Sequence, residues 1–293
     1  MSDFIGTKLT MNLGERSYDI ILKNGALENL YQFARLDRKV AVVTDSGVPA
    51  QYAQRVADQC RDAVIITVPQ GEASKSFKIL ETVLRQMLDF HMGRGDLVVA
   101  VGGGVVGDLA GFAASIYMRG IDFINGLAEA VKASLLADPE LFAIFEKGDI
   151  DGQINEIIYR SLRFKKNIVE QDETERGMRK ALNFGHTIGH GIEAVKGIKG
   201  RRTVGLFHGE CVALGMLPMI ESKALQKRVR AVYRRLGLPL RTTYNKEKVL
   251  AEMLHDKKAQ GGQITIIKVP GLGCWRAETI PVEGLRPLLG MEE

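Results

Sequence analysis

The sequence has few cysteines and no feature of a secreted or membrane-spanning chain. Its 293 residues include only 3 cysteines, Cys60, Cys211 and Cys274, which lie far apart and form no Cys-x-x-Cys pair. Sparse, unpaired thiols are typical of a reducing compartment, so we expect a cytoplasmic protein without disulfides. The first residues lack the basic and apolar regions of a signal peptide, and no apolar run reaches the length of a membrane span. Secretion and membrane insertion are both disfavoured.

The sequence also lacks long runs of like charge. Its formal net charge is +5, from 40 Lys and Arg against 35 Asp and Glu, and no basic arm is present. We therefore expect no nucleic-acid partner and interpret the positive excess as a bias toward anionic small-molecule substrates, with an ordinary solvated surface as the alternative. No internal repeat or low-complexity segment interrupts the chain. Its length suffices for two globular domains.

Strand and helix patterns alternate through the first part of the chain. The predicted elements are a hairpin over residues 8–23, buried strands over 39–44, 63–68 and 97–101, and helices over 48–59, 77–90 and 109–117. From residue 126 the pattern becomes helical. The predicted elements are a helix over 155–170, two helices within 209–236 that are split near 223–227, and strands over 263–268 and 274–278, with a turn at Pro270-Gly271. We predict an α/β fold with domains over 1–125 and 126–293.

A glycine cluster follows the predicted strand 97–101. In Gly102-Gly103-Gly104-Val-Val-Gly107-Asp108, the order of strand, glycines and helix would let backbone N–H groups approach a pyrophosphate. The cluster is neither a Walker loop nor a complete G-x-G-x-x-G, so a simple tight turn is the alternative. Asp45, directly after the first buried strand, is placed to accept a hydrogen bond from a ribose hydroxyl, or alternatively to cap the next helix.

Three of the five histidines lie close together in the sequence. His186 and His190 are four residues apart, which puts both imidazoles on one face of a helix, and His208 follows after a loop. This spacing is typical of a divalent-metal site completed by a carboxylate from elsewhere. The zinc-protease pattern is absent because Thr187 occupies the place of its catalytic Glu. Buried, hydrogen-bonded structural histidines are the alternative.

The motifs of the chain resemble, in order, those of the 3-dehydroquinate synthase family. They are Gly71-Glu-Ala-Ser-Lys75-Ser, Gly102-Gly-Gly-Val-Val-Gly-Asp108, Tyr117-Met-Arg119-Gly-Ile, Gly126-Leu-Ala-Glu129-Ala-Val-Lys132, Arg179-Lys-Ala-Leu-Asn183-Phe-Gly-His186-Thr-Ile-Gly-His190, His208-Gly-Glu and Asp256-Lys-Lys. The resemblance implies an N-terminal Rossmann-like domain that holds NAD, a C-terminal helical domain that holds zinc or cobalt, and an active site in the cleft between them.

The resemblance also implies a role for individual residues. The implied metal ligands are Glu129, His186 and His208, whereas His190 resembles a substrate or proton-relay residue. The implied NAD contacts are Asp45, Glu72, Lys75, Gly103, Gly104 and Asp108. The implied substrate shell is Lys132, Lys165, Glu175, Arg179, Asn183 and one of Lys257 and Lys258. Arg119 resembles a phosphate contact given to a neighbouring subunit, which implies a homodimer.

The activity that the resemblance implies is a carbon–oxygen lyase of the shikimate pathway. Its substrate, 3-deoxy-D-arabino-heptulosonate 7-phosphate, is oxidised by NAD, loses phosphate, is reduced again and closes to 3-dehydroquinate in an intramolecular aldol step. Alternatives are another sugar-phosphate cyclase, a metal-dependent polyol dehydrogenase, or an inactive paralogue that binds NAD or metal. Arg179 and Asn183 together favour the shikimate substrate.

One family segment has no counterpart here. Ile121-Asp-Phe-Ile124 is followed almost at once by Asn125-Gly126-Leu-Ala-Glu129, where the family carries roughly fifty more residues, more than one βαβ unit. The missing segment would supply nicotinamide-side contacts, an Asp near the metal site, and Lys and Asn residues that hold the substrate. We expect its loss to expose a sheet edge and apolar surface, and to leave this chain impaired or inactive and poorly folded.

Overall fold

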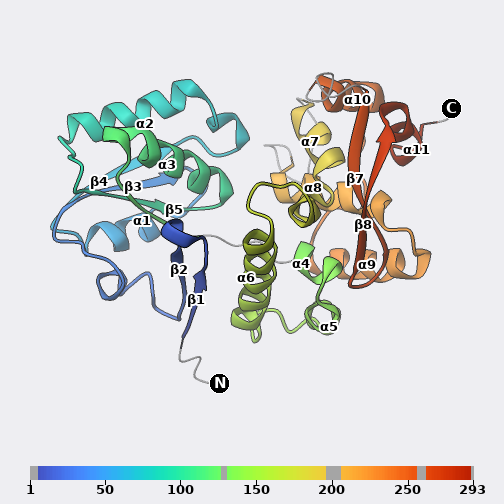
Figure 1. Cartoon of the computed structure of the whole chain (residues 1–293), viewed down its shortest axis with the longest axis horizontal. Coiled ribbons are helices and arrows are strands. Elements are labelled where there is room, and N and C mark those ends of the chain that lie inside the picture. Colours follow the sequence, from blue (N-terminus) through green and yellow to red (C-terminus); the bar gives the residue numbers. More distant parts are fainter. Residues whose placement is uncertain (1–5, 127–130, 196–205, 256–261, 292–293) are drawn as a thin grey trace. The chain divides into compact units, whose positions relative to one another are not determined.

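The computed structural model describes residues 6–126, 131–195, 206–255 and 262–291. Contacts divide the chain into two units, Met1–Lys8 with Ile21–Ala128 and Leu9–Ile20 with Glu129–Glu293 (Figure 1). This division differs from a single cut at residues 125 and 126, because the middle of the N-terminal hairpin belongs to the second unit. Asn12 donates from its backbone and its side chain to the Glu170 carboxylate, at 2.6 and 2.8 Å, and Arg16 pairs with Glu173 at 2.8 Å.

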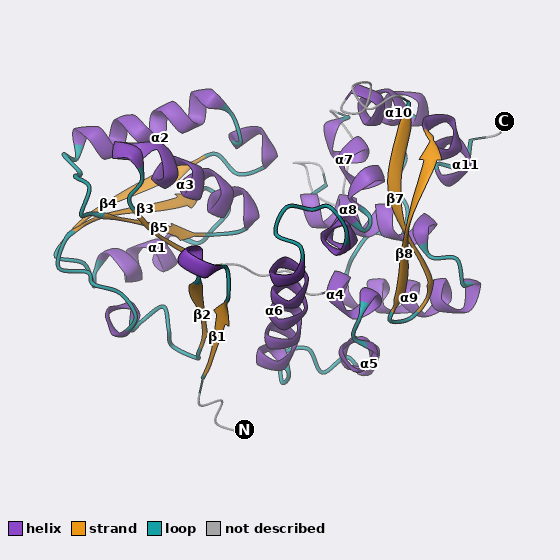
Figure 2. Cartoon of the chain, viewed as in Figure 1, coloured by secondary structure: helices purple, strands orange, loops and turns teal. Residues whose placement is uncertain are grey.

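A parallel sheet with strand order β4-β3-β5-β6 forms the centre of the first unit (Figure 2). Its strands are β3 (Lys39–Asp45), β4 (Asp62–Val68), β5 (Leu97–Val101) and β6 (Asp122–Gly126), joined by the helices α1 (Ala50–Ala57), α2 (Phe77–Asp89) and α3 (Gly104–Ile116). The three predicted buried strands are confirmed. Their continuous apolar runs follow from burial on both faces, since α1 packs on one face of the sheet and α2 and α3 pack on the other.

The glycine cluster is the start of α3 and not a loop before it. We predicted a helix from residue 109, but α3 begins at Gly104 with Gly103 as its N-cap, three residues after β5 ends. A Cβ at Gly107, in the first turns of α3, would lie 2.6 Å from the Asn125 side chain of β6, so a larger residue there would have to displace that side chain. Because glycine has a low helix propensity, the sequence pattern did not predict a helix start at Gly104.

Strand β6 is an edge of the sheet, and large apolar side chains are exposed beside it. Phe123 of β6 is 36% exposed, and Phe112 and Ile116 of α3 and Met118 after it are 52%, 45% and 44% exposed. Asp122 is the one charged residue of β6, and Arg38 pairs with it at 2.5 Å. The backbone N–H and C=O groups of an edge strand with so few charges can pair with a strand of another chain. This is the exposure expected where a family segment has no counterpart.

We expect the exposed apolar surface beside β6 to cause self-association. Phe112→Glu and Ile116→Lys place charges on that surface without touching the core, so they should reduce the fraction of species larger than a dimer. Size-exclusion chromatography with light scattering measures this fraction. Phe77→Glu is the matched control, because Phe77 is 85% exposed at the start of α2. A wild-type chain without such species, or an equal effect of the control, would contradict the prediction.

Helices build most of the second unit. They are α4 (Val131–Leu136), α5 (Pro139–Lys147), α6 (Ile154–Gln171), α7 (His186–Ala194), α8 (His208–Met216), α9 (Lys223–Leu236), α10 (Lys246–His255) and α11 (Leu285–Leu288). Polar caps mark several starts: the Asp138 side chain accepts from the Leu141 N–H before α5, and that of Ser222 from the Leu225 N–H before α9. Among the described residues, no helix is both long and apolar enough to cross a bilayer.

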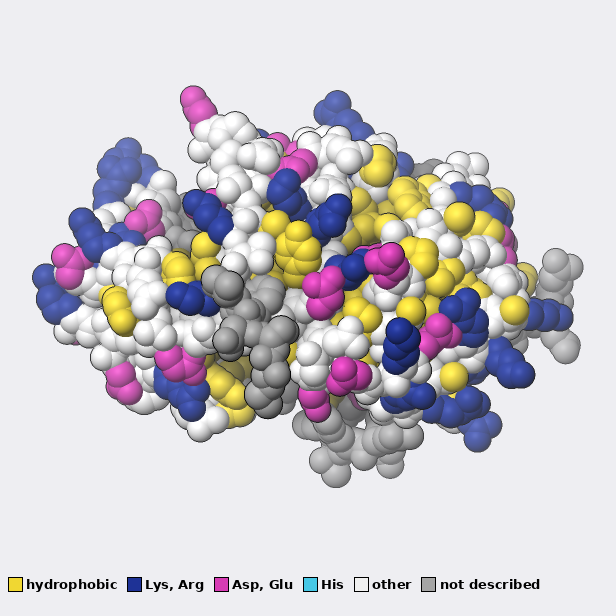
Figure 3. All heavy atoms as spheres, turned by 90° about the horizontal axis from the view of Figure 1, so that it is seen from below, with side chains coloured by type: hydrophobic (Ala, Val, Ile, Leu, Met, Phe, Trp, Pro, Cys, Tyr) yellow, Lys and Arg dark blue, Asp and Glu magenta, His cyan; other side chains and the backbone are white. Residues whose placement is uncertain are grey.

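Two short two-stranded sheets complete the chain. The predicted hairpin near the N-terminus is β1 (Thr7–Met11) and β2 (Tyr18–Leu22), and the predicted late pair is β7 (Gln263–Gly271) and β8 (Cys274–Pro281). The predicted turn at Pro270-Gly271 is wrong, because both residues still belong to β7. The chain reverses at Leu272 and Gly273, where Gly273 has a φ of +75°. On the surface shown in Figure 3, basic and acidic side chains are interspersed.

Candidate active site

The order of strands in the first unit sets where a nucleotide would bind. The chain proceeds from β3 to β4 on one side and then crosses to β5 on the other, so β3 and β5 flank the point where the order reverses. Open α/β sheets bind ligands at this point, outside the carboxyl ends of the strands. β3 ends at Asp45, and β5 ends just before Gly102. Two of the predicted cofactor-binding segments therefore meet at the topological switch.

The α3 N-terminus has room for an anion. A Cβ added at Gly103 or Gly104 would meet nothing within 4 Å, so the backbone N–H groups there are open to approach. The first N–H groups of a helix have no partner inside the helix and carry the positive end of its dipole. The absence of side chains at these two glycines fits the cradle that a pyrophosphate requires.

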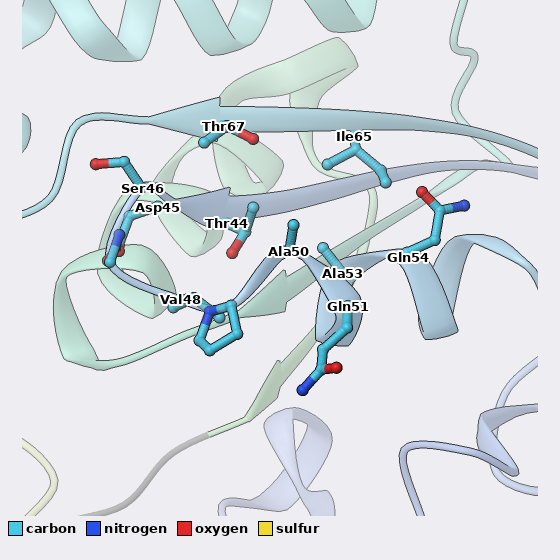
Figure 4. A pocket seen from close by; sticks show the side chains of 12 residues that line it. Thr44, Asp45, Ser46, Val48, Ala50, Gln51, Ala53, Gln54, Ile65 and Thr67 are labelled. Carbon is cyan, nitrogen blue, oxygen red and sulfur yellow. The ribbon is translucent and has the colours of Figure 1, made fainter.

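Asp45 shapes the turn after β3. Its carboxylate is largely buried and accepts a hydrogen bond from the Gly47 N–H at 2.7 Å. A cavity of about 680 Å³ opens here, lined by Asp45, Thr44 and Thr67 at the ends of β3 and β4 and by α1 residues such as Gln54 (Figure 4). Of the six predicted NAD contacts, only Asp45 lines this cavity. The cavity therefore covers only one side of the expected nucleotide site.

Three more of the predicted NAD contacts form one charged cluster. The Lys75 ammonium lies 2.8 Å from the Glu72 carboxylate and 2.8 Å from that of Asp108, the latter on α3. Burial alone would lower the pKa of Lys75, but hydrogen bonds with Asp108 and Glu72 raise it, so the group stays charged at neutral pH. Residues from two separate sequence motifs thus meet beside the glycine-rich helix start.

In the second unit, glycines bring α7 and α8 into close contact. A Cβ on Gly215 of α8 would lie 2.1 Å from the Gly185 carbonyl oxygen, and one on Gly189 would lie 2.9 Å from the Val212 Cα. Gly185 itself has a φ of +77°, which starts α7 at an angle that a side chain would oppose. Because the two backbones approach so closely, histidines from α7 and α8 can face each other.

The three predicted histidines form one cluster. The ring centroids of His186 and His190 lie 5.4 Å apart, those of His186 and His208 lie 5.6 Å apart, and those of His190 and His208 lie 5.3 Å apart. Burial, and next the charge of Lys132, lowers the pKa of His186 to about 4. His186 is therefore neutral at physiological pH, the state in which imidazole binds a metal.

Glu193 is a member of this cluster that the sequence analysis missed. Its carboxylate lies 2.8 Å from Nδ1 of His208 and 3.4 Å from Nδ1 of His190. Burial opposes ionisation, yet the hydrogen bonds from His190 and His208 prevail and lower the pKa of Glu193 to about 2. The signal in the sequence was His190-Gly-Ile-Glu193, a spacing of three that places both side chains on one helix face. Among the described residues, His190, Glu193 and His208 offer ligand atoms within 4.8 Å of one another.

A loop that leads into α7 carries three of the predicted substrate residues. The Asn183 side chain donates to the Glu175 carboxylate, and the Arg179 guanidinium donates to the Glu173 carbonyl. Asp172 orders this loop: its carboxylate accepts from the backbone N–H groups of Arg179, Gly177 and Arg176, at 2.9, 2.7 and 2.9 Å. These N–H groups, that of Arg179 first, lower the pKa of Asp172. The sequence analysis did not single out Asp172.

The remaining predicted residues are placed separately. The Lys132 ammonium donates to the Leu182 carbonyl at 2.7 Å, beside the start of α7, and Lys165 is half-buried on α6. Arg119 is exposed in the first unit, on a left-handed backbone with a φ of 69°. Glu129 and Lys257, with the alternative Lys258, lie outside the described residues.

Comparison with known proteins identifies the family of the chain. Residues 65–138 match the family model for the N-terminal part of 3-dehydroquinate synthase, and residues 126–259 match that for its C-terminal part. The 3-dehydroquinate synthase of Streptococcus mutans is 33% identical, over 96% of this chain and 99% of its own length. The chain belongs to the 3-dehydroquinate synthase family. A family member from Lactococcus lactis is 31% identical, with the same coverage.

Two solved structures share the fold of this chain. A 2-deoxy-scyllo-inosose synthase, complexed with carbaglucose-6-phosphate, NAD+ and Co2+, aligns with a TM-score of 0.75 at 19% identity, over 97% of this chain and 99% of that one. The 2-epi-5-epi-valiolone synthase ValA from Streptomyces hygroscopicus, with NAD+ and Zn2+ bound, aligns with a TM-score of 0.73 at 19% identity, over 95% and 98%. The Rossmann-like α/β fold followed by a helical unit is therefore confirmed.

The match to the curated relatives is longer than the chain. It extends over 359 aligned positions in the S. mutans comparison, whereas the chain has 293 residues, so at least 66 of these positions have no residue here. The relatives thus contain chain that this protein lacks. The exposed edge at β6 lies where the sequence motifs put the gap.

Proposed function

We propose that this chain carries the active site of a 3-dehydroquinate synthase, which converts 3-deoxy-D-arabino-heptulosonate 7-phosphate to 3-dehydroquinate and phosphate. The observation that carries the proposal is the meeting of His186, His190 and His208 at the end of a loop that presents Glu175 and Arg179. Family membership supports it. Arg179 and Asn183 favour the carboxylated shikimate substrate over those of other sugar-phosphate cyclases.

The residues present fit both a divalent metal and a nucleotide. His186 and His208 would hold the ion with Glu129, and the N-terminus of α3 with Asp45 would hold NAD. When bound, NAD supplies a hydride acceptor and donor, and the ion polarises the oxygen on the carbon that is oxidised. The relatives of known structure bind NAD+ with Co2+ or Zn2+.

The chain's own side chains would bind the substrate and move its protons. The substrate is an anion at both ends, and the cationic groups of Lys132, Lys165 and Arg179 suit its carboxylate and phosphate. Lys257 is proposed to contribute another cation, and Arg119 to reach the phosphate of a neighbouring subunit in a homodimer. His190, whose side chain is 54% exposed, is proposed to relay protons between substrate and solvent.

We expect the turnover of this chain to be low. The missing segment would carry nicotinamide-side and substrate contacts. Holding reactants in the correct geometry lowers the activation barrier by roughly 7–11 kcal/mol for a fully oriented pair, and the loss of these contacts removes part of that contribution. The proposed metal ligands Glu129, His186 and His208 and the proposed phosphate contact Arg119 are present in this chain. Affinity for metal and phosphate should therefore survive better than turnover.

Phosphate release from the heptulosonate phosphate tests the proposal. The full chain is incubated with substrate, NAD and zinc, beside the Glu129→Ala and His186→Ala variants. We expect slow release by the wild-type chain, and none by either variant because each lacks a proposed metal ligand. A folded, zinc-loaded wild-type chain that releases no phosphate would contradict the proposed activity. Equal release by the variants would contradict the proposed metal ligands.

A further inference from the structure

We propose that Glu193 is a positioning residue of the metal centre, which holds the Nδ1–H of His208 so that Nε2 of this ring faces the metal. The inference rests on the proposed function, and it concerns a residue outside the proposed ligand set of Glu129, His186 and His208. The claim is that a carboxylate on α7 sets the orientation of a ligand on α8.

The first step is the protonation of the His208 ring. Glu193 lies 2.8 Å from Nδ1 of His208. An ionised carboxylate only accepts hydrogen bonds, so Nδ1 must carry the proton of this contact. In the neutral imidazole the proton is then absent from Nε2, so Nε2 carries the lone pair that can bind a metal. Glu193 thus selects the tautomer of His208 as well as its orientation.

The second step is the parallel arrangement at His186. Its Nδ1 lies 3.2 Å from the Phe184 carbonyl oxygen, which also only accepts, so the lone pair of His186 is likewise at Nε2. Metal-ligating histidines usually donate their other ring N–H to a carboxylate or a backbone carbonyl. His186 and His208 have one such acceptor each, and their ring centroids are 5.6 Å apart.

The third step separates His190 from this pair. His190 shares the same Glu193 carboxylate at the longer distance of 3.4 Å, and its side chain is 54% exposed, against 34% for His208 and 16% for Glu193. The ring of His190 is therefore less constrained than that of His208. An ion held directly by His190, Glu193 and His208 is the competing arrangement, because their ligand atoms lie within 4.8 Å of one another.

Zinc affinity of the full chain tests the proposal without any need for turnover. Competition with a chromophoric chelator measures the affinity of the wild type and of Glu193→Gln, His186→Ala and His190→Ala. We expect Glu193→Gln to weaken zinc binding about 10- to 100-fold, the usual effect of losing a carboxylate behind a ligating histidine. His186→Ala should abolish binding, and His190→Ala should preserve it.

Glu210→Gln is the matched control for the loss of a charge. Glu210 lies two residues from His208, and its carboxylate accepts from the Phe207 N–H at 2.8 Å, a bond that glutamine can also make. It should leave zinc affinity unchanged. Circular dichroism shows that each variant is folded, and Glu193→Asp, which keeps a carboxylate, should recover part of the affinity lost in Glu193→Gln.

Cobalt absorption distinguishes a positioning role from direct ligation. If Glu193 is not a ligand, the visible spectrum of Co2+-loaded Glu193→Gln keeps the wild-type band positions and intensities. Altered bands, with binding that is lost in Glu193→Gln and His190→Ala but kept in His186→Ala, would overturn the proposal in favour of direct ligation. Unchanged zinc affinity in Glu193→Gln would also overturn it. Absence of zinc binding by the folded wild type would instead overturn the metal centre of the proposed function.

Discussion

Replacing Gly215 by alanine should destabilise the second unit more than a methyl group added at any other position of α8. The new Cβ would lie 2.1 Å from the Gly185 carbonyl oxygen and 2.8 Å from the Gly189 nitrogen. These two atoms form the first hydrogen bond of α7, at 2.9 Å, so neither can move without disturbing the helix. Overpacking costs about 1–3 kcal/mol and occasionally more, and backbone on both sides puts this substitution at the upper end.

The same substitution should also weaken zinc binding. His186 follows Gly185 directly, and a shift of α7 away from α8 separates it from His208. Urea unfolding followed by the fluorescence of Trp275, the single tryptophan, reports on this unit, because Trp275 packs against its core. Chelator competition gives the zinc affinity of the same sample.

Gly209→Ala is the matched control for Gly215→Ala. Gly209 lies in the first turn of the same helix, and a Cβ there would meet nothing within 4 Å. Alanine at such a site raises stability by about 0.4–1 kcal/mol, because it reduces the freedom of the unfolded chain. If both variants lose stability alike, the close contact between α7 and α8 is not the cause.

Strands β3 and β5 were predictable because they are buried on both faces. Val98, Val99 and Ala100 form a continuous apolar run, which is typical of a strand buried on both faces, and β5 is such a strand. The sequence could not give the order β4-β3-β5-β6, since the pairing of strands depends on contacts distant in the chain. The same limit applies to the middle of the hairpin, which belongs to the second unit and is hydrogen-bonded to it through Asn12 and Glu170.

The candidate site was predictable to the extent that its residues lie in recognisable motifs. His186 and His190 share a helix face by spacing alone, and His208 joins them through the packing of α8. Glu193 and Asp172 were missed for a physical reason. A single carboxylate on a helix or in an acidic turn is usually solvated, and only the three-dimensional contacts show that Glu193 meets two imidazoles and Asp172 three N–H groups.

The stability of the zinc-free chain should fall as the pH is lowered from about 6.5 to 4. Burial lowers the pKa of His186 to about 4 in the folded protein, from its ordinary value of 6.5. Between these values the unfolded chain binds a proton that the folded chain does not, so the free energy of unfolding rises with pH and is lost as pH falls. The full effect is about 3 kcal/mol and levels off below pH 4.

The pH window separates the effect of His186 from that of Glu193. Glu193, with a pKa lowered to about 2 from 4.5, contributes stability that is present above pH 4.5 and is lost only as the pH falls toward 2. Urea unfolding of the chelator-treated protein at several values between pH 7.5 and 4 measures the dependence, again through Trp275. His186→Gln has no ring to protonate and should flatten the dependence across this window. If the unfolding free energy of this variant depends on pH as strongly as that of the wild type, groups other than His186 cause the acid sensitivity.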